Sequence, residues 1–112
     1  MKRGEIYIVD LGPGAGYEVG GIRPVIVVSN DVYNVVALWV VVVPAVDAAD
    51  RFARLGVVAT GAEVGLPTDV SIIARQPRTL DASRFPEHPS GFVPDHLLKV
   101  LADKLKDELD LP

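Results

Sequence analysis

The stretch GAGYEVGGIRPVIVVSND, residues 14–31, joins a glycine-rich loop directly to a run of β-branched side chains. Four glycines fall within residues 14–21, and glycine lets a backbone turn freely and approach another group closely. Pro24 biases Arg23 toward extended backbone at the mouth of a strand, where its planar, permanently charged guanidinium suits a phosphate. Glu18 is the one carboxylate of this loop. A hairpin loop with a surface ion pair has the same pattern, so this stretch alone leaves both interpretations open.

Alternation and β-branched residues predict five strands, over residues 5–11, 24–29, 35–43, 54–60 and 68–74. The second is nearly all valine and isoleucine, which is typical of a strand buried on both faces. Polar residues predict a turn at 30–34, glycines and a proline predict a loop at 61–67, and residues 45–50 fit either a loop or a short helical turn. Trp39 lies within the valine-rich strand, so we expect it in the core or in a dimer interface.

The C-terminal residues predict one amphipathic helix. Asp95 stands in its first turn, and Asp95 with Lys99 and Lys104 with Glu108 are favourable i,i+4 pairs. Five leucines repeat at helical spacing: Leu97, Leu98, Leu101, Leu105 and Leu109. Strands followed by one helix predict a mainly β (α+β) fold, a small β-barrel or curled sheet with the helix laid on it.

Composition narrows the class of protein. A length of 112 residues predicts a single domain over residues 1–112, and the absence of cysteine together with a charged, strand-like start predicts a cytoplasmic protein without a signal peptide. The longest apolar run is well short of the roughly 20 residues of a membrane helix, so no membrane association is expected. The net charge of −4 argues against a generic nucleic-acid coat. Six of the seven arginines lie between Arg23 and Arg84, however, which leaves room for a small basic groove on an acidic body.

Three motifs together resemble the MazF/PemK (Kid) family of toxins. They are RGEIYIVD at residues 3–10, GIRPVIVVSND at 21–31 preceded by Glu18, and QPRTLD at 76–81. With the strand order and terminal leucine helix, the resemblance covers essentially the whole chain. It implies an SH3-like β-barrel of about five to seven strands, a homodimer, and a cognate antitoxin as partner. It also implies cleavage of single-stranded RNA without a metal or other cofactor, by attack of the ribose 2′-hydroxyl to leave a cyclic phosphate. CcdB-like gyrase poisons share the fold, so a toxin that binds a protein target, or a catalytically weakened homologue, is the alternative.

The resemblance assigns roles to individual residues. Arg23 matches the catalytic arginine of the family, and Glu18 matches its loop carboxylate, which could be the base for the 2′-hydroxyl. Two positions depart from the pattern: Val46 stands where a threonine or serine is common, and Ile73-Ala74-Arg75 lacks the aspartate that precedes the third motif in Kid-like members. Asp47 and Arg75 are the candidates to take over the acid–base and phosphate roles. The expected RNA contacts are Tyr17, Arg75, Gln76, Arg78 and Thr79.

Other side chains have ordinary explanations beside functional ones. Tyr17 could stack on a nucleobase or simply cover one end of the barrel. Arg51 and Arg54 flank Phe52, and a solvated strand edge accounts for them as well as RNA does. His88 and His96 are isolated and are expected at the surface.

Overall fold

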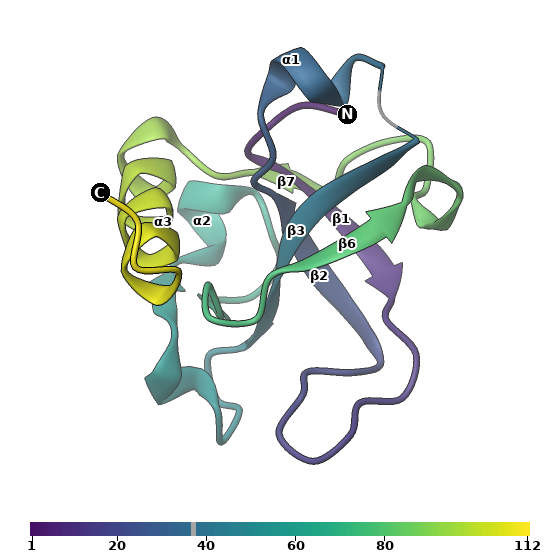
Figure 1. Cartoon of the computed structure of the whole chain (residues 1–112). Coiled ribbons are helices and arrows are strands. Elements are labelled where there is room, and N and C mark those ends of the chain that lie inside the picture. The colour runs from purple at the N-terminus through teal and green to yellow at the C-terminus, as the bar shows by residue number, and fades with distance from the viewer. Residues whose placement is uncertain (37) are drawn as a thin grey trace.

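Seven antiparallel strands form one strongly curled sheet in the computed structural model, which describes residues 1–36 and 38–112 (Figure 1). The strands are β1 (Glu5–Asp10), β2 (Ile22–Val27), β3 (Trp39–Asp47), β4 (Val57–Ala59), β5 (Val70–Ile72), β6 (Arg78–Asp81) and β7 (Gly91–Phe92). The helices are α1 (Asp31–Asn34), α2 (Gly61–Val64) and the 14-residue α3 (Asp95–Glu108), with 3-10 turns η1 (Ala53–Leu55) and η2 (Ala82–Arg84). The prediction of a mainly β fold with five to seven strands and a C-terminal helix is confirmed.

Strand β3 is the centre of the sheet, whose order is β4-β5-β3-β2-β1-β7 with β6 also paired to β3. One edge of β3 pairs with β2, where Val25 lies opposite Pro44 and Val27 opposite Val42. Its other edge is shared, because β6 pairs with residues 39–42 and β5 with residues 45–47. This division lets the sheet curl into a half-barrel around its longest and most valine-rich strand.

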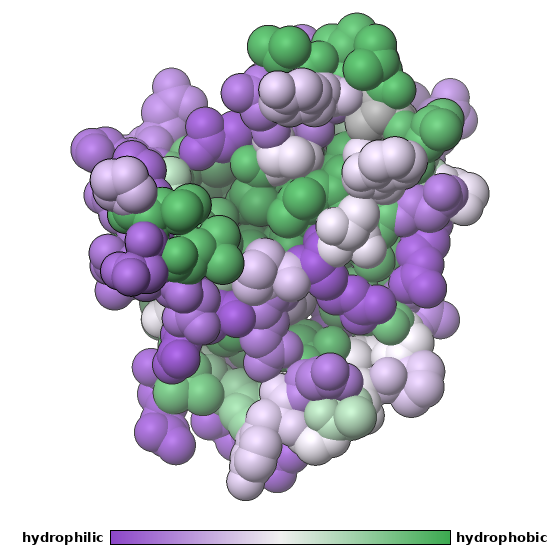
Figure 2. All heavy atoms as spheres, in the orientation of Figure 1, coloured by the Kyte–Doolittle hydropathy of each residue, from purple (hydrophilic) through white to green (hydrophobic). Residues whose placement is uncertain are grey.

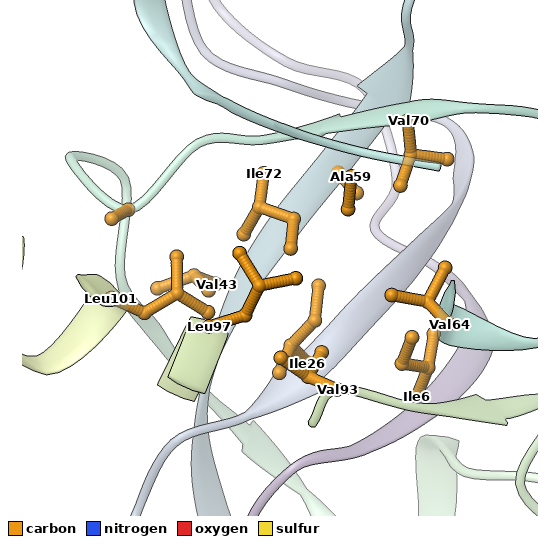
Figure 3. Packing of buried hydrophobic residues seen from close by; sticks show 12 residues of the cluster. Ile6, Ile26, Val43, Ala59, Val64, Val70, Ile72, Val93, Leu97 and Leu101 are labelled. Atoms are coloured by element: carbon orange, nitrogen blue, oxygen red, sulfur yellow. The ribbon is translucent and has the colours of Figure 1, made fainter. Parts of the chain in front are cut away.

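The two faces of the central strands bury two separate hydrophobic clusters. Ile26 and Val43 point into the cluster beneath α3, together with Ile72, Leu97 and Leu101 (Figure 3). Their neighbours in sequence point the other way, into a second cluster of twelve buried residues: Tyr7, Val9, Leu11, Val19, Val25, Val27, Val40, Val42, Val46, Ala53, Ile73 and Leu80. Residues 25–27 are therefore buried on both faces, as predicted for this strand.

The strand predicted over residues 35–43 is wrong at its start. The observed strand begins at Trp39, while Val35 and Val36 follow α1 and are exposed; position 37 lies outside the described residues. Local hydrogen bonds explain the difference, because the Asn30 side chain caps α1 and the buried Asn34 amide donates to the Ser29 carbonyl at 2.9 Å. These hydrogen bonds stabilise the helical turn more than the β preference of Val35 and Val36 stabilises a strand.

Trp39 is likewise not a core residue within this chain, since 59% of it is exposed. Its position at the exposed start of β3 leaves the interface alternative standing. The segment 45–50 is predicted from the sequence as a loop or a short helical turn. Residues 45–47 instead continue β3, and only residues 48–50 form a turn.

Two other strand predictions are too long, and the loop predicted at 61–67 contains a helix. Only 57–59 and 70–72 are strand, with η1 before β4. Thr60 ends β4 because it forms a capping box with Glu63: its hydroxyl accepts from the Glu63 amide, and the Glu63 carboxylate accepts from the Thr60 amide at 2.9 Å. The T-x-x-E signature was present in the sequence.

Helix α3 packs on the sheet through Leu97 and Leu101, as its periodicity predicts. Its ion pairs differ from the expected ones, because Lys99 pairs with Asp103 at 3.7 Å and Glu108 pairs with Arg75 from outside the helix. Among the described residues, no helix is both long and apolar enough to cross a membrane.

Candidate active site

The loop between β1 and β2 closes on itself. Gly21 donates its amide to the Gly12 carbonyl at 2.8 Å, and the Leu11 amide donates to the Gly21 carbonyl at 2.9 Å. Within the loop the backbone of Gly20 lies so close to Gly14 that a Cβ on Gly20 would stand 2.4 Å from the Gly14 nitrogen. Glycine is therefore required there for close approach, and the loop is compact.

Gln76 fastens this loop to the rest of the fold. Its Oε1 accepts a hydrogen bond from the Val19 amide at 2.8 Å, and its Nε2 donates to the Tyr17 carbonyl at 2.9 Å. Gln76 lies just after β5, so a residue of the third motif holds the loop that follows the first. In this structure its amide group positions the loop that carries Glu18.

A pocket of about 380 Å³ opens between the loop and the start of β6; we call it the loop pocket. Glu18 lies on its wall, exposed, with Oε1 accepting from the Ala15 amide at 2.8 Å. Arg78 lies on the wall formed by β6 and donates from Nη1 to the Leu11 carbonyl at 3.3 Å. The full lining is Pro13, Gly14, Glu18, Val19, Gln76, Pro77 and Arg78. Three of the sequence-predicted residues, Glu18, Gln76 and Arg78, are thus brought together.

Arg23 stands at the foot of the same loop without lining the pocket. It is the second residue of β2, opposite Val9, and is half-buried. Its Nε donates to the Gly20 carbonyl at 3.1 Å, which fixes the guanidinium against the loop. Among the described residues, its two Nη groups make no hydrogen bond.

The other candidates lie elsewhere. Asp47 is exposed at the end of β3, where its carboxylate accepts from the Ala49 amide at 2.8 Å, and Arg75 forms an ion pair with Glu108 at 2.8 Å. Neither lines the loop pocket. Thr79 is exposed on β6, opposite Val41. Val46 is 1% exposed within the second cluster, so the position where the family often has a hydroxyl is filled here by a core side chain.

Tyr17 has an aromatic neighbour that sequence reasoning did not assign to the site. Tyr17 is 80% exposed, and its ring meets the Phe52 ring edge to face, with 6.0 Å between the centroids. The Arg51 guanidinium lies 4.6 Å from the Phe52 ring centroid on the same surface. The only sequence signal was the pair of arginines flanking this phenylalanine, which fitted a solvated edge equally well.

The histidines make only surface contacts. His88 approaches Glu87 at 3.9 Å and His96 approaches Glu63 at 3.6 Å, and the ring of each is mostly exposed. Neither histidine lines the loop pocket. In the parts of the chain that the structure describes, no group of three or more His, Asp or Glu side chains could hold a metal ion.

The arrangement offers two kinds of group to a ligand beside the loop. Glu18 can accept a proton, and Arg23 with Arg78 can contact an oxyanion through fixed guanidinium groups. Backbone amides on a glycine-rich loop allow a polar ligand to approach closely. Such a site suits a phosphodiester with a nearby hydroxyl.

Known proteins with similar sequences and structures show the family of this chain. The profile of PemK-like, MazF-like toxins of type II toxin–antitoxin systems matches residues 2–109. Endoribonuclease PemK of Escherichia coli is 43% identical over 82 residues, which are 72% of this chain and 61% of PemK, so the match spans less than two thirds of that relative. Endoribonuclease EndoA of Bacillus subtilis is 33% identical over 99% of this chain and 92% of its own length.

Solved structures agree with the fold. MazF of Deinococcus radiodurans superimposes with a TM-score of 0.81 at 23% identity, covering 99% of this chain and 97% of that one. A mycobacterial endoribonuclease, solved in complex with its cognate antitoxin, has a TM-score of 0.73 at 26% identity over 100% of this chain and 97% of its own. The chain therefore belongs to the PemK/MazF family of type II toxin–antitoxin toxins, among whose members are proteins named endoribonucleases.

Proposed function

We propose that this protein is a sequence-specific endoribonuclease that cuts single-stranded RNA without a metal ion. The single observation that carries this proposal is the compact glycine loop, which presents Glu18 on the wall of a pocket and is bonded at its foot to Arg23. Family membership supports it, because EndoA of Bacillus subtilis, which is similar over 99% of this chain, is named an endoribonuclease. In this proposal, the contacts between the site and the bound RNA bases determine which base sequence is cut.

In the proposed reaction the ribose 2′-oxygen bonds to the adjacent phosphorus as the bond from phosphorus to the 5′-oxygen breaks. Glu18 takes the proton of the 2′-hydroxyl, and Arg23 stabilises the charge on the phosphorane oxygens. The departing 5′-oxygen needs a proton from an acid, and Asp47 is the candidate that the sequence offers. The products are a 2′,3′-cyclic phosphate and a free 5′-hydroxyl. Because Val46 is a core residue, the proposal gives no role to a hydroxyl at that position.

Around the cut bond, the pocket walls and the aromatic pair provide the RNA contacts. Arg78 suits a phosphate, and the exposed face of Tyr17 beside Phe52 suits a nucleobase, since every base has a π-face on which an aromatic ring can stack. Gln76 contributes by holding the loop, and Thr79 and Arg75 remain proposed contacts outside the loop pocket.

We further propose a homodimer formed through an apolar face. This face comprises six exposed residues around α1 and the start of β3: Val32, Tyr33, Val35, Val36, Leu38 and Trp39. Figure 2 shows hydrophobic side chains gathered over α1. Four residues of the face line a hollow of about 360 Å³: Tyr33, Val36, Leu38 and Trp39. A contiguous apolar surface of this kind is uncommon on a monomer, and a second copy would bury it symmetrically.

The natural regulator in this proposal is a cognate antitoxin acting in the cytoplasm. A mycobacterial relative has been solved with its cognate antitoxin, and Deinococcus radiodurans MazF with MazE. An antitoxin that covers the loop pocket and the foot of the glycine loop would exclude RNA from Glu18 and Arg23.

The test is incubation of the pure protein with a long single-stranded RNA in excess EDTA, followed by mapping of the fragment ends. We expect discrete cuts that end in cyclic phosphate. Loss of cutting in EDTA would overturn the metal-independent mechanism, and intact RNA at every protein concentration would overturn the nuclease. Intact RNA together with inhibited gyrase supercoiling would instead support the protein-binding alternative.

A further inference from the structure

Two further depressions lie beside the loop pocket, on the side toward α3. A second depression of about 210 Å³ shares Gln76 with the loop pocket. A third, also about 210 Å³, shares Leu55 and Arg75 with the second. The shared residues make the three depressions neighbours on one side of the molecule. We call the outer two together the distal furrow; Arg54, Leu55, Arg75, Lys104 and Glu108 are among its lining residues.

The distal furrow is basic although the chain carries a net charge of −4. Three cations line it, Arg54 from η1, Arg75 after β5 and Lys104 from α3, and they face one carboxylate, Glu108. These residues come from three separate parts of the sequence, and the fold collects them at one end of the loop pocket. A local excess of positive charge next to a proposed RNA site attracts the phosphates of the same strand.

Glu108, the carboxylate among the described lining residues of the distal furrow, forms an ion pair with Arg75 that a phosphate could replace. Glu108 accepts a hydrogen bond from Arg75 Nε at 2.8 Å, while the Arg75 side chain is 68% exposed. Ion pairs this exposed contribute little to stability because water screens them. A phosphate can therefore replace the carboxylate on Arg75 at small cost, and its bidentate geometry suits the guanidinium.

We propose that the distal furrow is a phosphate subsite for the RNA strand beyond the cut bond, formed by Arg54, Arg75 and Lys104. This inference rests on the proposed nuclease function and adds an electrostatic contact that does not read the base sequence. Single-stranded nucleic acids are commonly held in this way, by a positively charged groove that follows the backbone. The furrow thus extends the site from the scissile nucleotides to their neighbours.

The test compares a double variant, Arg54→Ala with Lys104→Ala, with the parent on two RNAs that contain the same mapped cut site. One RNA spans only the nucleotides around the cut, and the other continues about ten nucleotides further on each side. Binding is measured by fluorescence anisotropy over a range of salt concentrations, with a 2′-deoxy nucleotide at the cut site to prevent cleavage. The matched control removes the same charge from another surface of α3, by Lys99→Ala with Lys106→Ala.

We expect the double variant to cut the short RNA within about twofold of the parent and to bind the long RNA about tenfold more weakly at low salt. The salt dependence for the long RNA should fall by about 1.4 in log–log slope, because two phosphate contacts on a single strand are lost. The control pair should leave both RNAs unaffected. Glu108→Gln should strengthen binding of the long RNA by freeing Arg75.

Three results would overturn the subsite. Equal losses on the short and long RNA would place these residues in the fold or the chemistry instead, and an unchanged affinity for the long RNA would leave the furrow without a role in RNA binding. Loss of affinity for an Asp/Glu-rich peptide with unchanged binding of long RNA would assign the furrow to an acidic protein segment. Failure of the parent to cut either RNA defeats the nuclease proposal itself and is recognised separately.

Discussion

The side chains of the loop pocket have hydrogen-bond partners within the chain, whereas those of the apolar face are exposed to solvent. Around the pocket, Glu18, Gln76 and Arg78 all hydrogen-bond to backbone atoms of the same chain. On the apolar face, Val36 and Trp39 are 78% and 59% exposed and stay in contact with solvent. The pocket is thus shaped by bonds within one chain, whereas the face is the surface that we propose a second copy covers. Changes in the pocket should alter chemistry without altering assembly, and changes on the face should alter assembly first.

The largest effect is expected for Glu18→Gln. The amide oxygen of glutamine can still accept from the Ala15 backbone, so the loop keeps its shape while the base is lost. General-base contributions are about 10²- to 10⁴-fold, and cleavage in single-turnover assays should slow by that order. The acid limb of the pH–rate curve should disappear as well. If the variant keeps both the rate and the pH profile of the parent, the base is another group, with Asp47 the first to examine.

Arg23→Ala should slow cleavage by about 10²- to 10³-fold, the usual loss when one preorganised donor is removed from a charged transition state. The side chain is half-buried and, among the described residues, hydrogen-bonds only to the Gly20 carbonyl, so thermal unfolding and oligomeric state should change little. Arg84→Ala is a matched control, because Arg84 donates similarly to a backbone carbonyl, that of Asp10, but belongs to η2 and has no proposed role in the reaction. Equal rates for the two variants would remove Arg23 from the chemistry.

A charge on the apolar face tests the other half of the comparison. Val36→Asp places a carboxylate where we propose that two copies meet, and sedimentation should show at least a tenfold weaker dimer. Cutting should fall in proportion to the dimer lost, although Glu18 and Arg23 are untouched. Val58→Asp adds the same charge at another exposed valine, 60% exposed on β4, and should leave the dimer intact. A parent that is a monomer at micromolar concentration and still cuts RNA would contradict the proposed dimer.

The difference between the two regions also explains what the sequence could predict. Strands β1 and β2 and helix α3 follow from local patterns, because alternation and leucine spacing agree with their tertiary burial. Glu18 and Arg23 could be proposed as site residues from a motif, since they are close in sequence. Phe52 beside Tyr17 and the distal furrow could not, because curling of the sheet brings together residues far apart in the chain. The strand predicted from Val35 is wrong because the side-chain hydrogen bonds of Asn30 and Asn34 stabilise α1 just before these valines, and β3 begins only after them.

The smallest expected effect comes from the hydrogen bonds that hold α1, and with it the apolar face, to the N-terminal residues. Asp31 in α1 accepts from the Arg3 amide at 2.6 Å and from the Asn34 amide group at 3.1 Å, and these hydrogen bonds lower its pKa below the ordinary value of 3.8. A lowered folded-state pKa means that the stabilisation is present above pH 3.8 and is lost as the pH falls through the folded-state pKa. The single tryptophan, Trp39, lies on the same face and reports on it by fluorescence.

Acidification from pH 5 to well below pH 3.8 should therefore change Trp39 fluorescence in the parent before the sheet unfolds. In Asp31→Asn that step should be reduced, because asparagine does not titrate. Glu63→Gln is the matched control, since the Thr60 bonds lower the pKa of Glu63 in the same direction but α2 lies outside the apolar face. If Asp31→Asn and the parent respond identically while Glu63→Gln loses the step, the tie between α1 and the N-terminal residues does not hold the face. The acid sensitivity would then belong to the capping box of α2.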